Sequence, residues 1–124
     1  MAVRVFLVED SKHLQGVVTD LLRSMGDFEV IGASTTEAEA IHWLVERPAG
    51  WDLVVVDLVL EQGTGMGVIA RCEPRAPGAK VVVFSDYVTP GIRKHCLTLG
   101  ADAAIAKTEL ADFMAFCRQM VGQH

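Results

Sequence analysis

Short apolar runs alternate with amphipathic stretches along this chain, and this alternation restricts the possible folds more than any other feature. The runs are rich in valine and in other β-branched or aromatic residues, which is typical of strands. Five such runs occupy residues 3–8, 28–33, 53–57, 80–85 and 103–106. Strands and helices that alternate in sequence form a parallel sheet with helices on both faces. We therefore predict an α/β fold of three layers, with five parallel strands and five helices.

Helix-boundary residues divide the first half of the chain. Apolar residues recur at helical spacing over residues 14–25, and Gly26 ends that helix. Ser34 and Glu37 have the spacing of a capping box, which predicts that a second helix begins here. That helix is expected to end at Arg47, just before a proline.

The same kind of signal places the later helices. A glycine-rich loop over residues 63–67 leads into a short third helix that ends before Pro74. Pro90 suits the first position of a fourth helix, which closes at Gly100. Thr108 is expected to cap the last helix.

Composition limits the classes of function. A chain of 124 residues that is 51% hydrophobic and 22% charged is typical of one globular domain, over residues 1–124. A net charge of -5 argues against nucleic acid as a direct partner, because phosphate backbones require a basic face. No segment reaches the roughly 18 apolar residues of a membrane span, and the first apolar run is too short for a signal peptide. We therefore expect a cytoplasmic protein without a membrane partner.

The three cysteines give no sign of a disulfide framework or a zinc site. Cys72, Cys96 and Cys117 are odd in number and widely spaced, without a CxxC pair. We interpret all three as small buried hydrophobic residues.

Polar, reactive side chains fall at the ends of four predicted strands. They are Glu9 and Asp10 after the first strand, Asp57 at the end of the third, Ser85 at the end of the fourth and Lys107 after the fifth. Because the carboxyl ends of parallel strands meet at one edge of the sheet, these side chains should converge there.

These residue types suit phosphoryl transfer. A carboxylate can act as a nucleophile and form an acyl phosphate. Clustered carboxylates repel one another and attract a divalent cation such as Mg²⁺, which is commonly held by carboxylates and phosphate oxygens. Lysine and serine can each contact a phosphate oxygen. Taken singly, each residue could be only a turn, a helix cap or a surface charge; Asp10 and Ser11, for example, could simply begin the first helix.

The chain also resembles a known family. The segments FLVED (6–10), VVVDL (54–58), VVVFS (81–85) and AIAK (104–107), together with Gly65, are similar to the receiver domain of bacterial two-component response regulators. The resemblance extends over essentially the whole chain and fits either a stand-alone receiver or the receiver of a longer regulator. It implies a flavodoxin-like, doubly wound sheet with strand order 2-1-3-4-5.

The resemblance implies a phosphorylation switch rather than an enzyme. Asp57 would accept a phosphoryl group from a sensor histidine kinase or a phosphotransfer protein. Asp10 and Asp57 would coordinate Mg²⁺ directly, with Glu9 acting through water and the Val59 carbonyl as a backbone ligand.

The remaining roles concern the switch. Ser85 and Lys107 would contact the phosphoryl group and relay the change. Family members carry an aromatic residue where this chain has Ala104, so Tyr87 is the nearest substitute as a switch residue. Output would pass through the face formed by helix four, strand five and helix five, which Arg93, Lys94 and Arg118 could decorate and which could equally support a homodimer.

Other departures from the family bear on the loops. Thr108 replaces the proline that usually follows the lysine, and a cis bond before a non-proline residue costs about 3 kcal/mol, so we expect either a trans bond or evidence of strain. The family's proline is also missing from residues 61–63. Val59 cannot orient an attacking water, which predicts slow self-dephosphorylation, whereas Asp86 places a charge where a phosphodonor would approach.

Two rival hypotheses remain at this point. The chain could be a pseudo-receiver that acts only as a protein-interaction module, although no acid or lysine of the motif is lost. It could instead be an enzyme on a similar sheet. An aspartate-nucleophile phosphatase would need a second aspartate where Val59 stands, and a nucleotide-binding protein would need a glycine-rich turn after the first strand.

Overall fold

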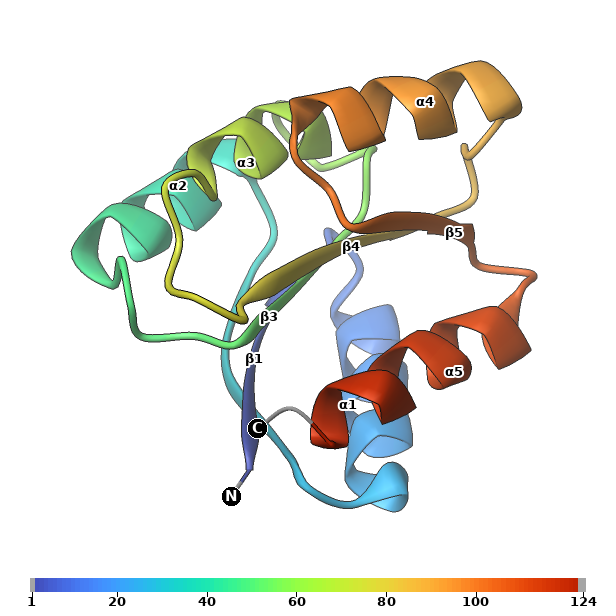
Figure 1. Cartoon of the computed structure of the whole chain (residues 1–124). Helices are drawn as coiled ribbons and strands as arrows, with labels where there is room; N and C mark the ends of the chain where they lie inside the picture. Colours follow the sequence, from blue (N-terminus) through green and yellow to red (C-terminus); the bar gives the residue numbers. More distant parts are fainter. Residues whose placement is uncertain (1, 123–124) are drawn as a thin grey trace.

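Five parallel strands form one sheet in the computed structural model, which describes residues 2–122 (Figure 1). Their order is β2-β1-β3-β4-β5, which confirms the predicted flavodoxin-like topology. The strands are β1 (Val3–Val8), β2 (Phe28–Ser34), β3 (Leu53–Val56), β4 (Lys80–Ser85) and β5 (Ala103–Ala106). The helices are α1 (Lys12–Met25), α2 (Glu37–Glu46), α3 (Gly65–Arg71), α4 (Pro90–Leu99) and α5 (Leu110–Val121).

The helices cover both faces of the sheet, so the molecule has three layers. Helices α1 and α5 lie on one face, and α2, α3 and α4 lie on the other (Figure 1). Side chains of the central strands alternate between two hydrophobic cores: Leu53 and Val55 of β3 belong to the α1–α5 side, and Val54 and Val56 to the opposite side. A strand buried on both faces is apolar at every position, which is why the sequence of β3 shows no alternation.

The start of α2 differs from the prediction. Ser34 is the last residue of β2, and its carbonyl accepts a hydrogen bond from the Glu9 amide at 3.0 Å, so its backbone stays extended. The capping box predicted at Ser34 and Glu37 is therefore wrong. Thr36 is the N-cap, and its hydroxyl accepts from the Glu39 amide at 3.2 Å.

Two later helix boundaries also differ from the prediction. Thr108 does not cap α5, because the turn continues to Glu109, whose carboxylate accepts from the Ala106 amide at 3.0 Å. Gly65 and Gly67 lie in α3 rather than in the preceding loop. Gly65 passes so close to the Asp57 carbonyl that no side chain would fit at this position. Pro90 opens α4, as predicted.

The cysteines are free and buried, as the sequence predicts. Burial raises the pKa of Cys72 and of Cys117 to about 12, so both thiols stay protonated at neutral pH. The Lys107–Thr108 bond is trans, which is the first of the two expected outcomes; the cis bond in the described chain precedes Pro74. Among residues 2–122, no helix has both the length and the apolar composition needed to cross a bilayer.

Candidate functional site

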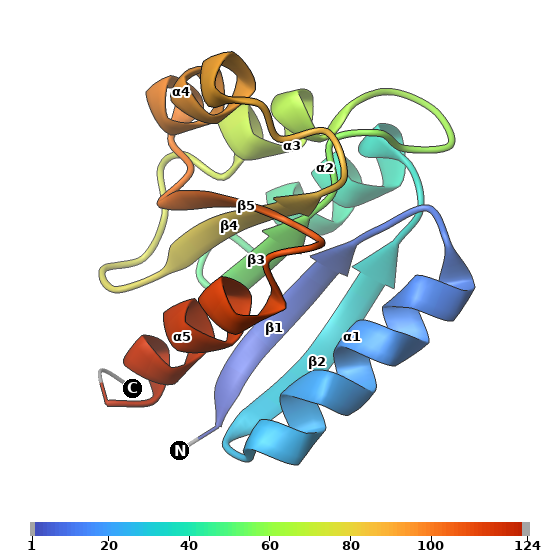
Figure 2. The same ribbon diagram turned by 90° about the vertical axis from the view of Figure 1, so that its right-hand side faces the viewer.

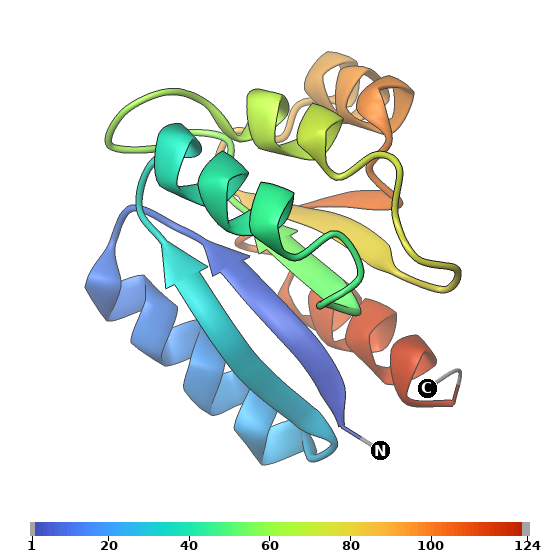
Figure 3. The same cartoon turned by 90° about the vertical axis from the view of Figure 1, so that its left-hand side faces the viewer.

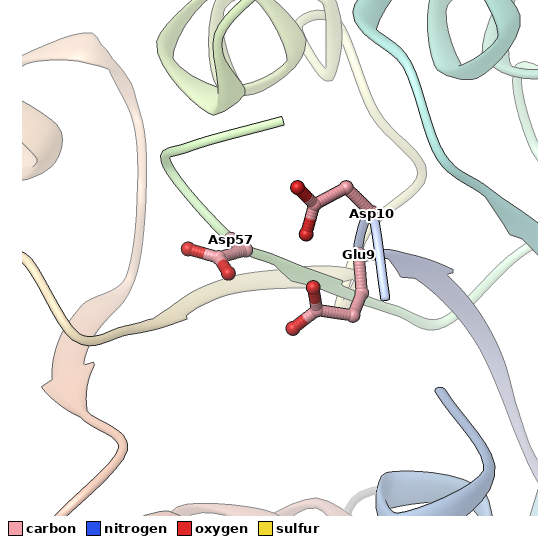
Figure 4. Close-up of side chains that lie close together, drawn as sticks. All are labelled: Glu9, Asp10 and Asp57. Carbon is pink, nitrogen blue, oxygen red and sulfur yellow. The ribbon is translucent and has the colours of Figure 1, made fainter. Parts of the chain in front are cut away.

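Three carboxylates meet at the carboxyl edge of the sheet. Glu9 and Asp10 follow β1, and Asp57 follows β3; these two strands are hydrogen-bonded neighbours with Val8 paired to Val56. One carboxylate oxygen from each of the three acids lies within 4.8 Å of the others. Figure 4 shows the side chains of Glu9 and Asp10 directed toward Asp57. The predicted convergence of these acids is therefore present in the structure.

Asp57 is the centre of the hydrogen-bond network. Its side chain is only 8% exposed. Atom Oδ1 accepts from the Ser85 hydroxyl at 2.5 Å, and Oδ2 accepts from the Lys107 ammonium at 2.8 Å. The Val59 amide approaches Oδ1 at 3.4 Å. The structure thus brings Ser85 and Lys107 to Asp57 across sequence separations of 28 and 50 residues.

Lys107 also links Asp57 to Glu9. Its ammonium donates to Glu9 Oε1 at 2.6 Å. Burial by itself lowers the pKa of Lys107, but the hydrogen bonds to Asp57 and Glu9 outweigh burial and raise it. Lys107 is therefore a permanent positive charge between two carboxylates.

Glu9 is buried and held from several sides. The Ser11 amide donates to its carboxylate at 3.1 Å, and the Gln15 side-chain amide donates to its carbonyl at 2.7 Å. Burial raises the pKa of Glu9 in spite of the opposing effect of Lys107. Sequence reasoning missed Gln15, because a glutamine at this position of α1 looks like any solvent-facing helix residue.

The donor set fits a hard divalent cation. Three carboxylates face a single ammonium, so the cluster keeps an excess of negative charge when its acids are ionised. Oxygen ligands of this kind suit Mg²⁺ or Ca²⁺ rather than a soft metal. The acidic cluster is able to hold a metal ion.

Of the predicted switch residues, Ser85 and Tyr87 lie next to this centre. The Tyr87 amide approaches the Ser85 hydroxyl at 3.4 Å, while the residue as a whole is 57% exposed. Ala104 is buried in the core on the α2–α3–α4 side. Val59 is exposed and forms an antiparallel bridge with Thr64 across the loop that follows β3. Asp86 is exposed beside Tyr87.

The sequence matches the response regulator receiver domain over residues 5–115. The transcriptional regulatory protein DesR of Bacillus subtilis is 25% identical over 113 residues, covering 91% of this chain and 55% of that protein. The response regulator VraR of Staphylococcus aureus is 26% identical over 115 residues, covering 93% of this chain and 54% of VraR. The chain thus spans about half the length of these curated relatives.

Solved structures share the fold. The response regulator domain of Thermotoga maritima CheB superimposes with a TM-score of 0.83 at 21% identity, covering 98% of both chains. The receiver domain of a Pseudomonas aeruginosa sensor histidine kinase, whose structure has a magnesium ion coordinated in the active-site cleft, gives 0.78 at 21% identity and covers 98% of this chain and 99% of that one. The family match extends over most of the sequence and agrees with the fold and the acidic cluster: the chain belongs to the response regulator receiver domain family.

Proposed function

We propose that Asp57 is the phosphoacceptor of a two-component signalling switch and that Glu9, Asp10 and Asp57 hold Mg²⁺. One observation carries the proposal: the Asp57 carboxylate lies between the acidic cluster, the Lys107 ammonium and the Ser85 hydroxyl. A nucleophile, a cation site and two donors for phosphate oxygens are therefore in contact. The Val59 carbonyl would complete the metal ligands from the backbone.

The proposed reaction moves a phosphoryl group from a phosphohistidine to Asp57. A carboxylate oxygen of Asp57 attacks phosphorus, the phosphorus–nitrogen bond breaks, and the imidazole leaves and takes up a proton. The bound cation would neutralise charge on the phosphoryl oxygens. Lys107 supplies a second positive charge at the same carboxylate, and Ser85 supplies a hydroxyl donor.

The switch would follow from the change in what these donors contact. In the structure, Ser85 and Lys107 both donate to the bare Asp57 carboxylate. On a phosphorylated Asp57 we expect both to donate to phosphoryl oxygens, which shifts the ends of β4 and β5. Ala104 is too small for the aromatic movement expected in this family, so we propose Tyr87, which contacts Ser85 through its amide, as the side chain that reports the change.

Tyr87 gives this part of the proposal its own test. We expect Tyr87→Ala to be phosphorylated normally and to bind its output partner more weakly, because the exposed ring lies outside the reacting centre. The measurement is partner affinity with and without phosphorylation. An affinity unchanged by the substitution would show that Tyr87 takes no part.

The partners are proposed at the level of class. Receiver domains interact with histidine kinases and with partner proteins. We propose a sensor histidine kinase or a phosphotransfer protein as the donor, and output through the α4–β5–α5 face to a protein, an appended domain or a second copy of the chain. Arg93 on this face pairs with Glu109 at 3.3 Å.

Transfer from a radiolabelled kinase tests the donor. Autophosphorylated histidine kinases are mixed one by one with the protein in Mg²⁺ and with Asp57→Ala. We expect one kinase to lose label rapidly to the wild-type protein and none to label the variant. If no kinase transfers label and small-molecule donors also fail, the interaction-module hypothesis takes its place.

A further inference from the structure

The loop between Asp57 and α3 is fastened to the start of α2 by a residue outside the acidic cluster. The Glu37 carboxylate accepts a hydrogen bond from the Thr64 amide at 2.8 Å, and the Glu37 amide donates to the Gln62 carbonyl at 3.0 Å. Figures 2 and 3 both show this loop reaching the beginning of α2. The loop is therefore held at two points by one residue that is 27 positions away from Thr64 in sequence.

The loop is shaped to receive the Glu37 side chain. Gly63 has a φ of 83°, and a Cβ at this position would overlap the Glu37 side chain. A Cβ at Gly67, in the first turn of α3, would overlap the other Glu37 carboxylate oxygen. The Glu37 side chain thus occupies the space that the missing side chains of both glycines leave open. This fit indicates a fixed position for Glu37, unlike that of a freely mobile surface glutamate.

The same loop carries the backbone next to the phosphoacceptor. The Val59 amide approaches Asp57 Oδ1 at 3.4 Å, and Val59 pairs with Thr64 in an antiparallel bridge. Thr64 is the residue whose amide Glu37 holds. A chain of contacts therefore runs from Glu37 through Thr64 to Val59, whose carbonyl we propose as a metal ligand.

We propose that Glu37 is a positioning residue for the phosphorylation site, which restrains the loop after Asp57 so that the Val59 backbone is set for the cation and the phosphoryl group. This inference rests on the proposed function. The sequence lacks the family's proline at residues 61–63, so ring rigidity does not restrain this loop. The hydrogen bond to Glu37 supplies a restraint from outside the loop.

The test compares two substitutions at the position with a matched control. Glu37→Ala removes the acceptor for Thr64, whereas Glu37→Gln keeps an oxygen acceptor and removes the charge. Glu39→Ala is the control, because Glu39 lies on the same first turn of α2 but its carboxylate accepts hydrogen bonds from Thr35, at the start of α2, rather than from the loop after Asp57. Each variant is measured by Mg²⁺ titration calorimetry, by amide exchange at Thr64 and by the rate of phosphorylation from a small-molecule donor.

We expect Glu37→Ala to weaken Mg²⁺ binding and slow phosphorylation by roughly three- to tenfold, the value of one lost hydrogen bond, and to speed exchange of the Thr64 amide. Glu37→Gln and Glu39→Ala should stay close to wild type in all three measurements. If Glu37→Gln behaves like Glu37→Ala, the effect is one of charge and the inference is wrong.

Failure of this inference and failure of the proposed function give different results. A wild-type protein that binds Mg²⁺ but accepts no phosphoryl group contradicts the proposed function, and the Mg²⁺ titration of Glu37→Ala still decides the role of Glu37. A Glu37→Ala variant that binds Mg²⁺ like wild type while the Thr64 amide exchanges faster overturns the inference, even where phosphorylation proceeds.

Discussion

Lys107 determines the charge balance of the site at the scale of single residues. It is paired with both Glu9 and Asp57, and all three side chains are largely buried. Two carboxylates held this close repel each other unless a cation lies between them. In the metal-free protein the Lys107 ammonium is the cation that offsets this repulsion. We propose that a bound Mg²⁺ offsets it as well.

Replacement of Lys107 by methionine tests this role. Lys107→Met keeps an unbranched side chain of nearly the same length and leaves Glu9 and Asp57 without their ammonium. We expect the metal-free variant to lose about 2 kcal/mol of unfolding free energy, and Mg²⁺ to restore part of that loss. Urea unfolding with and without Mg²⁺ measures both effects.

Lys80→Met is the matched control. The Lys80 ammonium lies 3.9 Å from Asp102 and its side chain is far more exposed, so its substitution should change stability by less than about 0.5 kcal/mol. Equal losses of unfolding free energy in the two variants would mean that the buried ion pairs of Lys107 contribute no more to stability than the exposed pair of Lys80.

The sequence predicted which residues meet at the site better than how they contact one another. Glu9, Asp57 and Lys107 each follow a strand, and parallel strands bring their carboxyl ends to one edge. The double pairing of Lys107 was not predictable, because it depends on the lateral distance between β1, β3 and β5. The contact of Glu37 with Thr64 was hidden for the same reason: it joins segments that only the packing of α2 against the loop brings together.

The start of α2 shows the limit of sequence patterns at the scale of elements. Ser34 and Glu37 have the spacing of a capping box, yet the chain stays extended through Ser34, whose carbonyl accepts from the Glu9 amide. Pairing between β1 and β2 therefore delays the helix by two residues, and the capping position passes to Thr36. Strand boundaries fixed by long-range hydrogen bonds are invisible to a local motif.

This correction predicts the effect of two threonine substitutions. Thr36→Ala removes the hydroxyl that accepts from the Glu39 amide and should cost about 1 kcal/mol of unfolding free energy. Thr108→Ala should change stability by less than about 0.5 kcal/mol, since Thr108 is exposed and does not cap α5. Thermal or urea unfolding compares them. If Thr108→Ala lost more stability than Thr36→Ala, this assignment of the caps would be wrong, because Thr108 would then cap α5.

At the scale of the whole molecule, the cation site should couple metal binding to global stability. The three acids come from loops after two different strands, so the site exists only in the folded chain. A ligand that binds only the native state stabilises it, by about 2.7 kcal/mol when its concentration is 100 times Kd. The alternation of runs predicted a parallel sheet with helices on both faces, whereas the strand order was predicted by the family resemblance alone.

The coupling can be measured by thermal unfolding across a Mg²⁺ series at constant ionic strength. We expect Tm to rise with Mg²⁺ for the wild-type protein and to stay constant for Asp10→Asn, which would remove one of the proposed ligands. Without metal, Asp10→Asn should be at least as stable as wild type, because one repelling charge has been removed. The same Mg²⁺ dependence in both proteins would place the metal elsewhere.

The central claim, that Asp57 accepts a phosphoryl group with Mg²⁺, is tested most directly by the intact mass of the protein after incubation with a small-molecule phosphodonor. The account predicts a gain of one phosphoryl group that disappears when Mg²⁺ is chelated and is absent in Asp57→Ala. A wild-type mass that stays unchanged with every donor, or a gain that persists in Asp57→Ala, would contradict it.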